Sequence, residues 1–124
     1  MQRFLTYGES LKTKSYAFAL RTVNLYKHLS QESKEFVLSK QVLRSGTSIG
    51  ANVAEGNRGQ SKADFVNKLA IALKEADETA YWRNLLRDSE FITIAQAESL
   101  LSDCLELQKL LTSSINTAKK NLNR

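Results

Sequence analysis

The 124-residue sequence contains no proline, one cysteine and one histidine. Because proline kinks helices and recurs in turns, its absence favours long helices over a turn-rich β sandwich or barrel. The single cysteine, Cys104, excludes an internal disulfide and a thiolate-rich zinc site, and it fits a reducing compartment. No run approaches the roughly 18 apolar residues of a membrane span, and the first residues lack the apolar core of a secretion signal. A soluble, cytoplasmic protein is therefore expected.

The composition that remains is ordinary for a globular chain, with 42% apolar and 25% charged residues. Apolar residues recur every three or four positions, the helical period, over about residues 10–29, 31–57, 61–89 and 93–120. Short connections require such helices to pack as antiparallel neighbours. The sequence therefore predicts one all-α domain over residues 1–124, an antiparallel up-down-up-down four-helix bundle.

The second helical stretch is glycine-rich, and each glycine costs about 1 kcal/mol relative to alanine in a helix. Its apolar stripe nevertheless keeps its phase through Gly46 and Gly50. We therefore predict a helix stabilised by packing, in which the small residues let a neighbouring helix approach closely. Helix caps are expected at three polar residues: Ser30, Ser61, and Thr93, the last forming a capping box with Gln96.

The fourth stretch carries more apolar surface than one helix contact requires, because Leu100, Leu107 and Leu110 lie beside its main stripe. A second buried face would indicate self-association. Alternatively, a broad stripe covers two neighbouring helices of the same chain. Periodicity alone does not choose between the two.

The net charge of +5 is unevenly distributed: +5 in residues 1–60, −4 in 61–108 and +4 in 109–124. The antiparallel topology gathers much of the positive charge at one end of the bundle. The residues expected there are Lys12, Lys14, Arg58, Lys62, Lys119, Lys120 and Arg124. Such a cluster predicts contact with RNA or DNA phosphates without base specificity. Alternatively, the last basic residues only complement a helix dipole and solubilise the tail.

Glu75 and Glu78 share one helical face, and carboxylates on bundle helices can hold paired metals. A ferritin-like di-iron site also needs Glu-x-x-His on two helices, whereas His28 is the only histidine. No metal or other cofactor is therefore expected, and the two carboxylates are predicted to bind Asn52 or Arg44 across the bundle.

The sequence offers only weak candidates for a catalytic nucleophile or a nucleic-acid-binding loop. Neither Cys104 nor Ser48 lies in a motif that supplies a histidine base, so no enzymatic activity is predicted. Residues 56–59 match the GXXG loop of KH domains, but without flanking strands a helix-to-helix turn is the better interpretation. Tyr81 and Trp82 fit an interface anchor and core packing equally well.

Two segments resemble a known bacterial family, the four-helix bundle proteins encoded in intervening sequences of 23S ribosomal RNA genes. The resemblance covers about residues 11–90 and depends on Ser-Ile-x-x-Asn-Val-Ala-Glu-Gly followed by Glu-Ala-x-Glu-Thr-x-Tyr-Trp. Its signature residues are Ser48, Asn52, Glu55, Gly56, Glu75 and Glu78. Gly50 stands where many relatives have proline.

This resemblance implies a homopentameric ring without enzymatic activity. It also implies a relation to the accessory variability determinant of diversity-generating retroelements, which binds a reverse transcriptase and nucleic acid. The expected function is a non-enzymatic, self-associating helical scaffold with a basic surface for RNA, DNA or a nucleic-acid-handling protein. The alternative is a protein–protein adaptor with no nucleic-acid binding.

Overall fold

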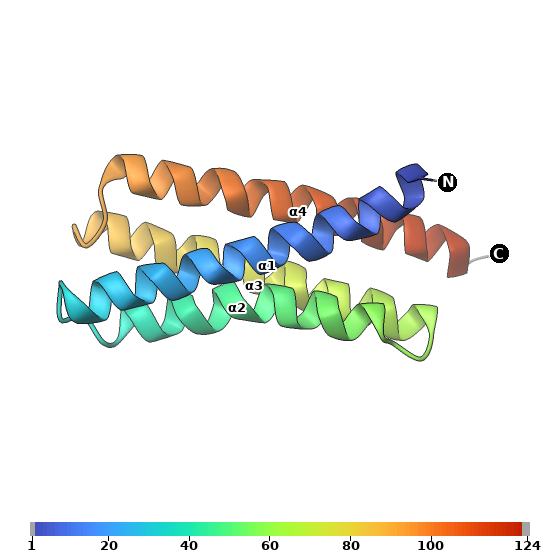
Figure 1. The fold of residues 1–124 in the computed structure, drawn as a ribbon, viewed down its shortest axis with the longest axis horizontal. Coiled ribbons are helices and arrows are strands. Elements are labelled where there is room, and N and C mark those ends of the chain that lie inside the picture. Colours follow the sequence, from blue (N-terminus) through green and yellow to red (C-terminus); the bar gives the residue numbers. More distant parts are fainter. Residues whose placement is uncertain (1, 123–124) are drawn as a thin grey trace.

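The computed structural model describes residues 2–122, and the side chains of residues 10–122. Within this range it consists of helices joined by short connections, without strands: α1 (Gln2–Gln31), α2 (Leu38–Asn57), α3 (Lys62–Asp88) and α4 (Ile94–Leu122). Successive helices run in opposite directions (Figure 1). The predicted all-α, antiparallel up-down-up-down bundle is confirmed.

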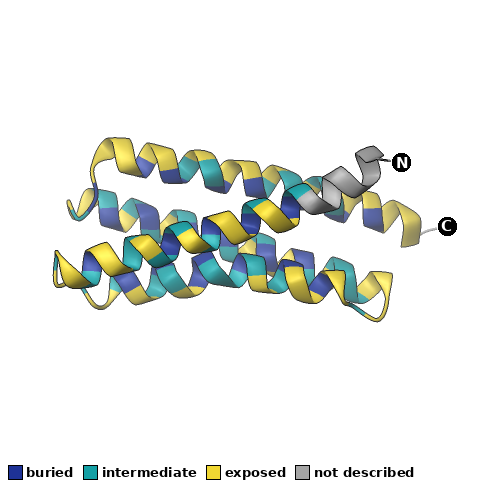
Figure 2. Cartoon of the chain, in the orientation of Figure 1, coloured by how far each residue is buried: buried dark blue, intermediate teal, exposed yellow. Residues whose placement is uncertain are grey.

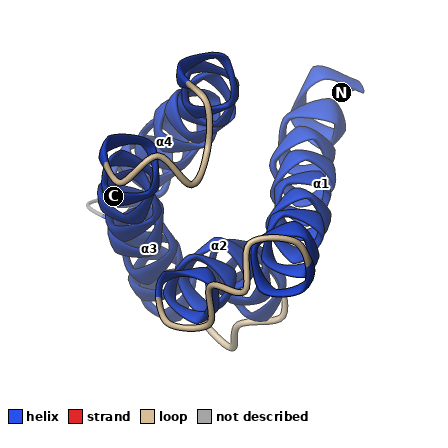
Figure 3. Ribbon diagram, turned by 90° about the vertical axis from the view of Figure 1, so that its left-hand side faces the viewer, coloured by secondary structure: helices blue, strands red, loops and turns tan. Residues whose placement is uncertain are grey.

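The four helices do not pack equally. α2 lies between α1 and α3, and α3 packs on α4, whereas α1 and α4 meet only sparsely. Seen along its length, the bundle is an open horseshoe with α1 and α4 at the open side (Figure 3). Buried residues follow the inner stripe of each helix (Figure 2), and the largest of them include Leu29, Ile49, Leu69, Leu86, Leu107 and Leu111.

The closest helix contact joins α1 to α2 through the glycines of α2. A Cβ on Gly46 would lie 2.3 Å from Cγ2 of Thr22, and one on Gly50 would lie 3.2 Å from the carbonyl oxygen of Ser15. Both distances are shorter than ordinary van der Waals contact, so these positions require glycine for proximity. The predicted close approach at small residues is confirmed.

The boundary between the first two helices was predicted wrongly. α1 continues through Ser30, whose hydroxyl donates to the carbonyl of Tyr26, so Ser30 does not cap α2. Residues 32–37 are non-helical, with Lys34 in the left-handed region at φ 54°. The Glu35 carboxylate then accepts hydrogen bonds from the backbone N–H groups of residues 37–39, so α2 begins at Leu38 rather than at residue 31. α1 also starts earlier than predicted, at Gln2.

The other two caps agree with the sequence. The Ser61 hydroxyl accepts from the backbone N–H of Asp64 at 3.1 Å. Thr93 and Gln96 form the reciprocal capping box, with distances of 2.8 and 3.1 Å. Serine and threonine oxygens here satisfy backbone donors that the first helical turn leaves unpaired.

The broad apolar stripe of α4 is used within one chain. Leu100 and Leu107 are buried, and Leu110 is partly buried against the core. The extra apolar surface therefore covers neighbouring helices, and it gives no support for self-association. The two apolar residues at the ends of α4, Ile94 and Leu122, are exposed.

Replacing Gly46 with alanine tests the α1–α2 contact. Alanine favours a helix by about 1 kcal/mol, but its Cβ would collide with Thr22, and overpacking costs about 1–3 kcal/mol. We expect Gly46→Ala to lower the free energy of unfolding in urea. Thr22→Ser removes the methyl group at 2.3 Å but keeps Cβ at 2.9 Å and the hydroxyl at 3.0 Å, so in that background Gly46→Ala should destabilise less but still measurably. Equal destabilisation in both backgrounds would refute the contact as the cause.

Candidate functional site

One end of the bundle gathers basic side chains from two separate segments of the chain. The α2–α3 connection and the end of α4 lie together at this end (Figure 1). The exposed basic residues there are Arg58, Lys62, Lys119 and Lys120. None of them forms an ion pair within residues 10–122. Arg124, the predicted member at the C-terminus, lies outside the described residues. We call these four exposed residues the basic end.

Lys14 differs from the rest of the predicted basic set. Its Nζ lies 2.7 Å from Oε2 of Glu106, on the part of α4 that precedes its last 16 residues. At 1.5 Å per residue, that contact is about 24 Å from the end of α4. The structure therefore places Lys14 in an ion pair along the side of the bundle and not with the basic end. Lys12, only two residues earlier on α1, also lies along the side, exposed to solvent.

Acidic side chains near the basic end are few. Glu55, at the end of α2, lies 3.5 Å from Nζ of Lys68, so its charge is partly compensated within the chain. Asp64 is partly buried in the first turn of α3, where its carboxylate favours the helix dipole. The net charge at this end is consequently positive, and it faces solvent.

A second polar cluster joins α2 to α3 through Arg44. Its Nη1 donates to Glu75 Oε2 at 3.0 Å, and its Nη2 donates to Glu78 Oε1. The same Glu78 oxygen accepts from the indole N–H of Trp82 at 3.1 Å. Of the two partners predicted for the carboxylates, the structure shows Arg44. Asn52 instead donates to the carbonyl of Ser48 within its own helix.

Two aromatic side chains extend this cluster on the outside of α3. The rings of Tyr81 and Trp82 meet edge to face, with centroids 5.0 Å apart. Tyr81 is 56% exposed, whereas Trp82 is partly buried and packs against the core. Trp, Tyr and Arg are the residue types that dominate interface energetics. We call Arg44, Glu75, Glu78, Tyr81 and Trp82 the outer α2–α3 patch.

The patch also sets an ionisation state. The hydrogen bond from Arg44 lowers the pKa of Glu78, partial burial opposes that effect, and the Trp82 N–H adds to it. The hydrogen bond between Arg44 and Glu78 also raises the pKa of Arg44. Glu78 and Arg44 are therefore both charged across the physiological range.

The remaining signature residues have local, structural roles. Ser48 donates to the carbonyl of Arg44. A Cβ on Gly56 would lie 3.2 Å from Cβ of Lys68, so glycine there lets α3 approach the end of α2. Glu55 forms the ion pair with Lys68. These contacts fix how α2 and α3 pack.

Sequence patterns gave no warning of a buried arginine in α3. Arg83 is only 6% exposed, and its guanidinium donates to the carbonyl of Ala97 at 3.1 Å and to the side chain of Asn84. Its Nε has no partner within the described residues. Thr79 and Arg83 are both buried on this side of α3, whereas Ala80 is only partly buried.

Residues with catalytic chemistry are inert or isolated. Burial raises the pKa of the Cys104 thiol to about 12, so it stays protonated and unreactive. His28 is exposed near the end of α1, where it suits the helix dipole. Among the described residues, no three acidic, histidine or cysteine side chains lie close enough to hold a metal ion. None of the helices described has the length and apolarity needed to cross a bilayer.

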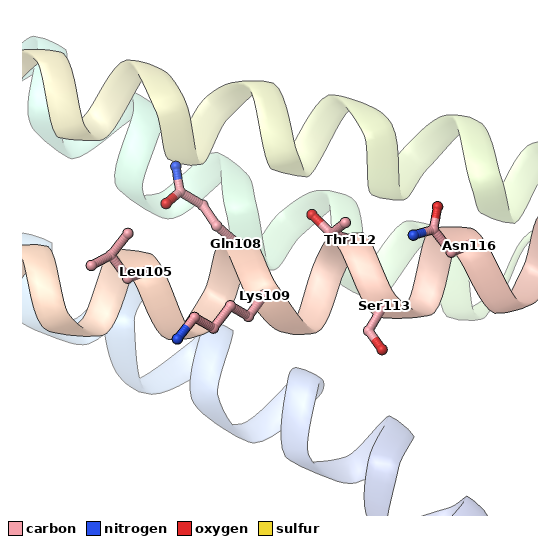
Figure 4. Close-up of a pocket in the computed structure, with 6 residues that line it drawn as sticks. All are labelled: Leu105, Gln108, Lys109, Thr112, Ser113 and Asn116. Carbon is pink, nitrogen blue, oxygen red and sulfur yellow. The ribbon is translucent and has the colours of Figure 1, made fainter.

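A shallow pocket lies along the outer surface of α4. It is lined by Leu105, Gln108, Lys109, Thr112, Ser113 and Asn116. Gln108, Thr112 and Asn116 extend toward α3, whereas Lys109 and Ser113 extend toward α1 (Figure 4). Gln108 donates to Asp77 of α3 at 2.7 Å. Because one helix supplies the whole lining, the pocket is an open hollow with a single charged group, Lys109.

The pKa of Glu78 predicts how stability depends on pH. Glu78→Gln is expected to lower the free energy of unfolding by about 0.5–1 kcal/mol at neutral pH, as for other exposed pairs. Since Arg44 depresses the pKa of Glu78 in the folded state, the wild type loses this increment as the pH falls from about 4.5 through the folded-state value. Urea unfolding followed by fluorescence of Trp82, the only tryptophan, measures it.

The stabilities of wild type and Glu78→Gln should converge at acid pH. Glu98→Gln is the control, because Glu98 is exposed on α4 and forms no ion pair within residues 10–122. A difference between wild type and Glu78→Gln that persists unchanged at low pH would contradict the assignment.

Comparison with known proteins places these features in a family. Residues 10–113 match the family model for the 23S rRNA-intervening sequence protein, and no curated protein matches the chain. The fold is similar to a crystal structure from Bacteroides thetaiotaomicron VPI-5482, described as a protein of unknown function from the S23 ribosomal protein family. The two are 58% identical with a TM-score of 0.88, and the match covers 89% of this chain and 98% of that one. The chain therefore belongs to the 23S rRNA-intervening sequence protein family.

Proposed function

We propose that this protein is a non-enzymatic, self-associating helical scaffold of the cytoplasm whose basic end contacts the phosphate backbone of RNA or DNA. The observation that carries the proposal is the basic end itself. Its lysines and arginine come from two segments far apart in the sequence, the α2–α3 connection and the end of α4, and all are exposed without an acidic partner within the described residues. Because only folding brings these segments together, the charge is a property of the tertiary structure.

The chemistry of the basic end favours backbone contact over base recognition. Lysine is a flexible point charge that binds phosphate oxygens without reading sequence. Binding then releases counterions from the nucleic acid, so affinity falls as salt rises. Assembly of several copies would repeat the basic end around the oligomer and strengthen the local positive potential.

Exposed apolar side chains support the self-associating part of the proposal. Tyr16 and Leu20 lie one turn apart on α1, and both are at least half exposed. Tyr81 and Leu85 repeat the arrangement on α3. These residues replace the apolar stripe of α4 as the candidate contact surface between copies. A ring of five copies, which the family resemblance implies, is the assembly we propose.

The non-enzymatic part is supported by the inertness of the buried Cys104 and the isolation of His28. A protonated thiol is a poor nucleophile, and Cys104 is buried with a raised pKa. His28 lies at the opposite end of α1 from the basic end. Neither residue offers nucleophilic catalysis at the proposed contact surface, which supports a non-enzymatic role.

The outer α2–α3 patch favours a second candidate function, a protein–protein adaptor without nucleic-acid binding. Arg44 is held by two carboxylates, and Tyr81 projects beside it with more than half of its surface exposed. A preorganised group of Arg, Tyr and Trp is typical of interface anchors. The partner that the resemblance implies is a nucleic-acid-handling protein such as a reverse transcriptase.

Charge reversal at the basic end separates the two functions. Lys119→Glu with Lys120→Glu is expected to weaken RNA binding at least about tenfold at low salt, and to reduce the salt slope by about 1 for each lysine. Lys34→Glu with Lys40→Glu is the matched control, because both lysines are exposed at the opposite end of the bundle. Electrophoretic shift with a labelled RNA at two salt concentrations gives both quantities.

Equal loss in the two double variants would show a response to net charge alone, and absence of RNA binding by the wild type would reject the basic end as a nucleic-acid surface. In that second case, a partner captured through nuclease treatment and lost in Tyr81→Ala would support the adaptor.

A further inference from the structure

From residue 10 onward the charges on α1 are of one sign. Between residues 10 and 31 the helix carries four basic residues and no acidic ones: Lys12, Lys14, Arg21 and Lys27. Lys14 and Arg21, seven residues apart, share one face of the helix, whereas Lys12 and Lys27 lie on the other side. Lys12 and Lys27 are exposed and form no ion pair within the described residues, whereas the two basic residues between them are occupied.

The residues that pair with Lys14 and Arg21 come from α4. Lys14 Nζ lies 2.7 Å from Glu106 Oε2, and Arg21 Nη1 lies 2.7 Å from Asp103 Oδ2. Arg21 also donates to the backbone carbonyl and the hydroxyl of Ser99, at 3.3 and 2.9 Å. A carboxylate, a hydroxyl and a carbonyl thus surround the guanidinium, and phosphate oxygens suit the same donors.

These contacts close the one seam of the bundle that packing does not close. α1 and α4 otherwise meet sparsely, and they border the open side of the horseshoe (Figure 3). The four charged side chains keep between 34% and 51% of their surface exposed. Exposed ion pairs are weak and screened by salt, so a polyanion held nearby at high local concentration can compete with them.

The charges of α4 are segregated along the helix. Its acidic residues, Glu98, Asp103 and Glu106, all precede its basic ones, Lys109, Lys119 and Lys120. A nucleic acid held at the basic end therefore meets attractive charge along the second half of α4. It meets the acidic half only where Glu106 and Asp103 cover Lys14 and Arg21.

We propose that the α1–α4 seam is a masked extension of the nucleic-acid surface, in which Glu106 and Asp103 hold Lys14 and Arg21 until backbone phosphates replace the two carboxylates. Lys14 and Arg21 are two turns apart, about 10 Å along the helix, so each engages a different phosphate. The masking limits binding to chains long enough to reach from the basic end. This inference depends on the proposed function, because it takes nucleic acid as the ligand.

The test removes the carboxylates without changing side-chain size. Asp103→Asn with Glu106→Gln is expected to bind a short fluorescein-labelled oligouridylate about fivefold more tightly at low salt, measured by fluorescence anisotropy. The matched control is Glu90→Gln with Glu98→Gln, which removes the same charge from exposed residues without ion pairs within residues 10–122. We expect this control to change affinity less than twofold, because long-range charge is screened.

A double-mutant cycle then identifies the mechanism. In a background of Lys14→Gln with Arg21→Gln, removal of the two carboxylates should bring no gain, because the masked side chains are gone. Circular dichroism and thermal melting confirm that each variant is folded. If the double carboxylate variant does not fold, the single variants Asp103→Asn and Glu106→Gln replace it, and each should show part of the gain in affinity.

The outcomes separate the two proposals. A gain equal to that of the control, or one that survives without Lys14 and Arg21, overturns the masking while leaving the basic end in place. Absence of binding by the wild type and by the unmasked variant overturns the proposed function and the masking together. A gain that depends on both Lys14 and Arg21 supports both proposals.

Discussion

The helix-to-helix contacts of the bundle are of two kinds, and the rest of the structure depends on this difference. Three neighbouring pairs, α1–α2, α2–α3 and α3–α4, are joined by packing. Gly46 lets α1 approach α2, the Ser45–Thr79 hydrogen bond of 2.8 Å lies buried between α2 and α3, and the buried Arg83 of α3 donates to the carbonyl of Ala97 in α4. Burial of apolar side chains stabilises these seams at about 25 cal/mol per Å². The fourth pair, α1 and α4, is joined through exposed charges, each pair contributing about 1 kcal/mol or less. α1 is therefore held to α2 by packing and to α4 mainly by ion pairs.

The antiparallel order of the helices also determines where the charges lie. Because alternate helices reverse direction, segments far apart in the sequence meet at the basic end, and the acidic first half of α4 lies along the basic α1. The weak seam and the positive surface adjoin each other as a result. A polyanion that binds the end of the bundle thus reaches a seam whose closure depends on the same kind of interaction. Stability and binding are coupled at this point, whereas the packed seams depend mainly on burial of apolar side chains.

Much of the fold follows from local rules that sequence periodicity captures. The four helices, their order, the caps at Ser61 and Thr93 and the close approach at Gly46 needed only helical spacing and the chemistry of small and hydroxyl side chains. Other features depend on rotation of one helix against another, which spacing does not determine. Lys14 belongs to the side of the bundle because Glu106 faces it, and Arg83 is buried because the first turn of α4 supplies a carbonyl. The Glu35 cap escaped detection because glutamate is an unusual capping residue, and it lies three positions before the first residue of the helix it caps.

The central claim is that charge, and not packing, closes the α1–α4 seam. The reaction rate of Cys104 with a thiol reagent tests it directly, because this sole cysteine is fully buried in α4 next to Asp103. If ion pairs hold the seam, rising potassium chloride should speed the reaction in the wild type, while Asp103→Asn with Glu106→Gln should react fast already at low salt. A rate that is independent of salt and equal in both proteins would contradict the claim.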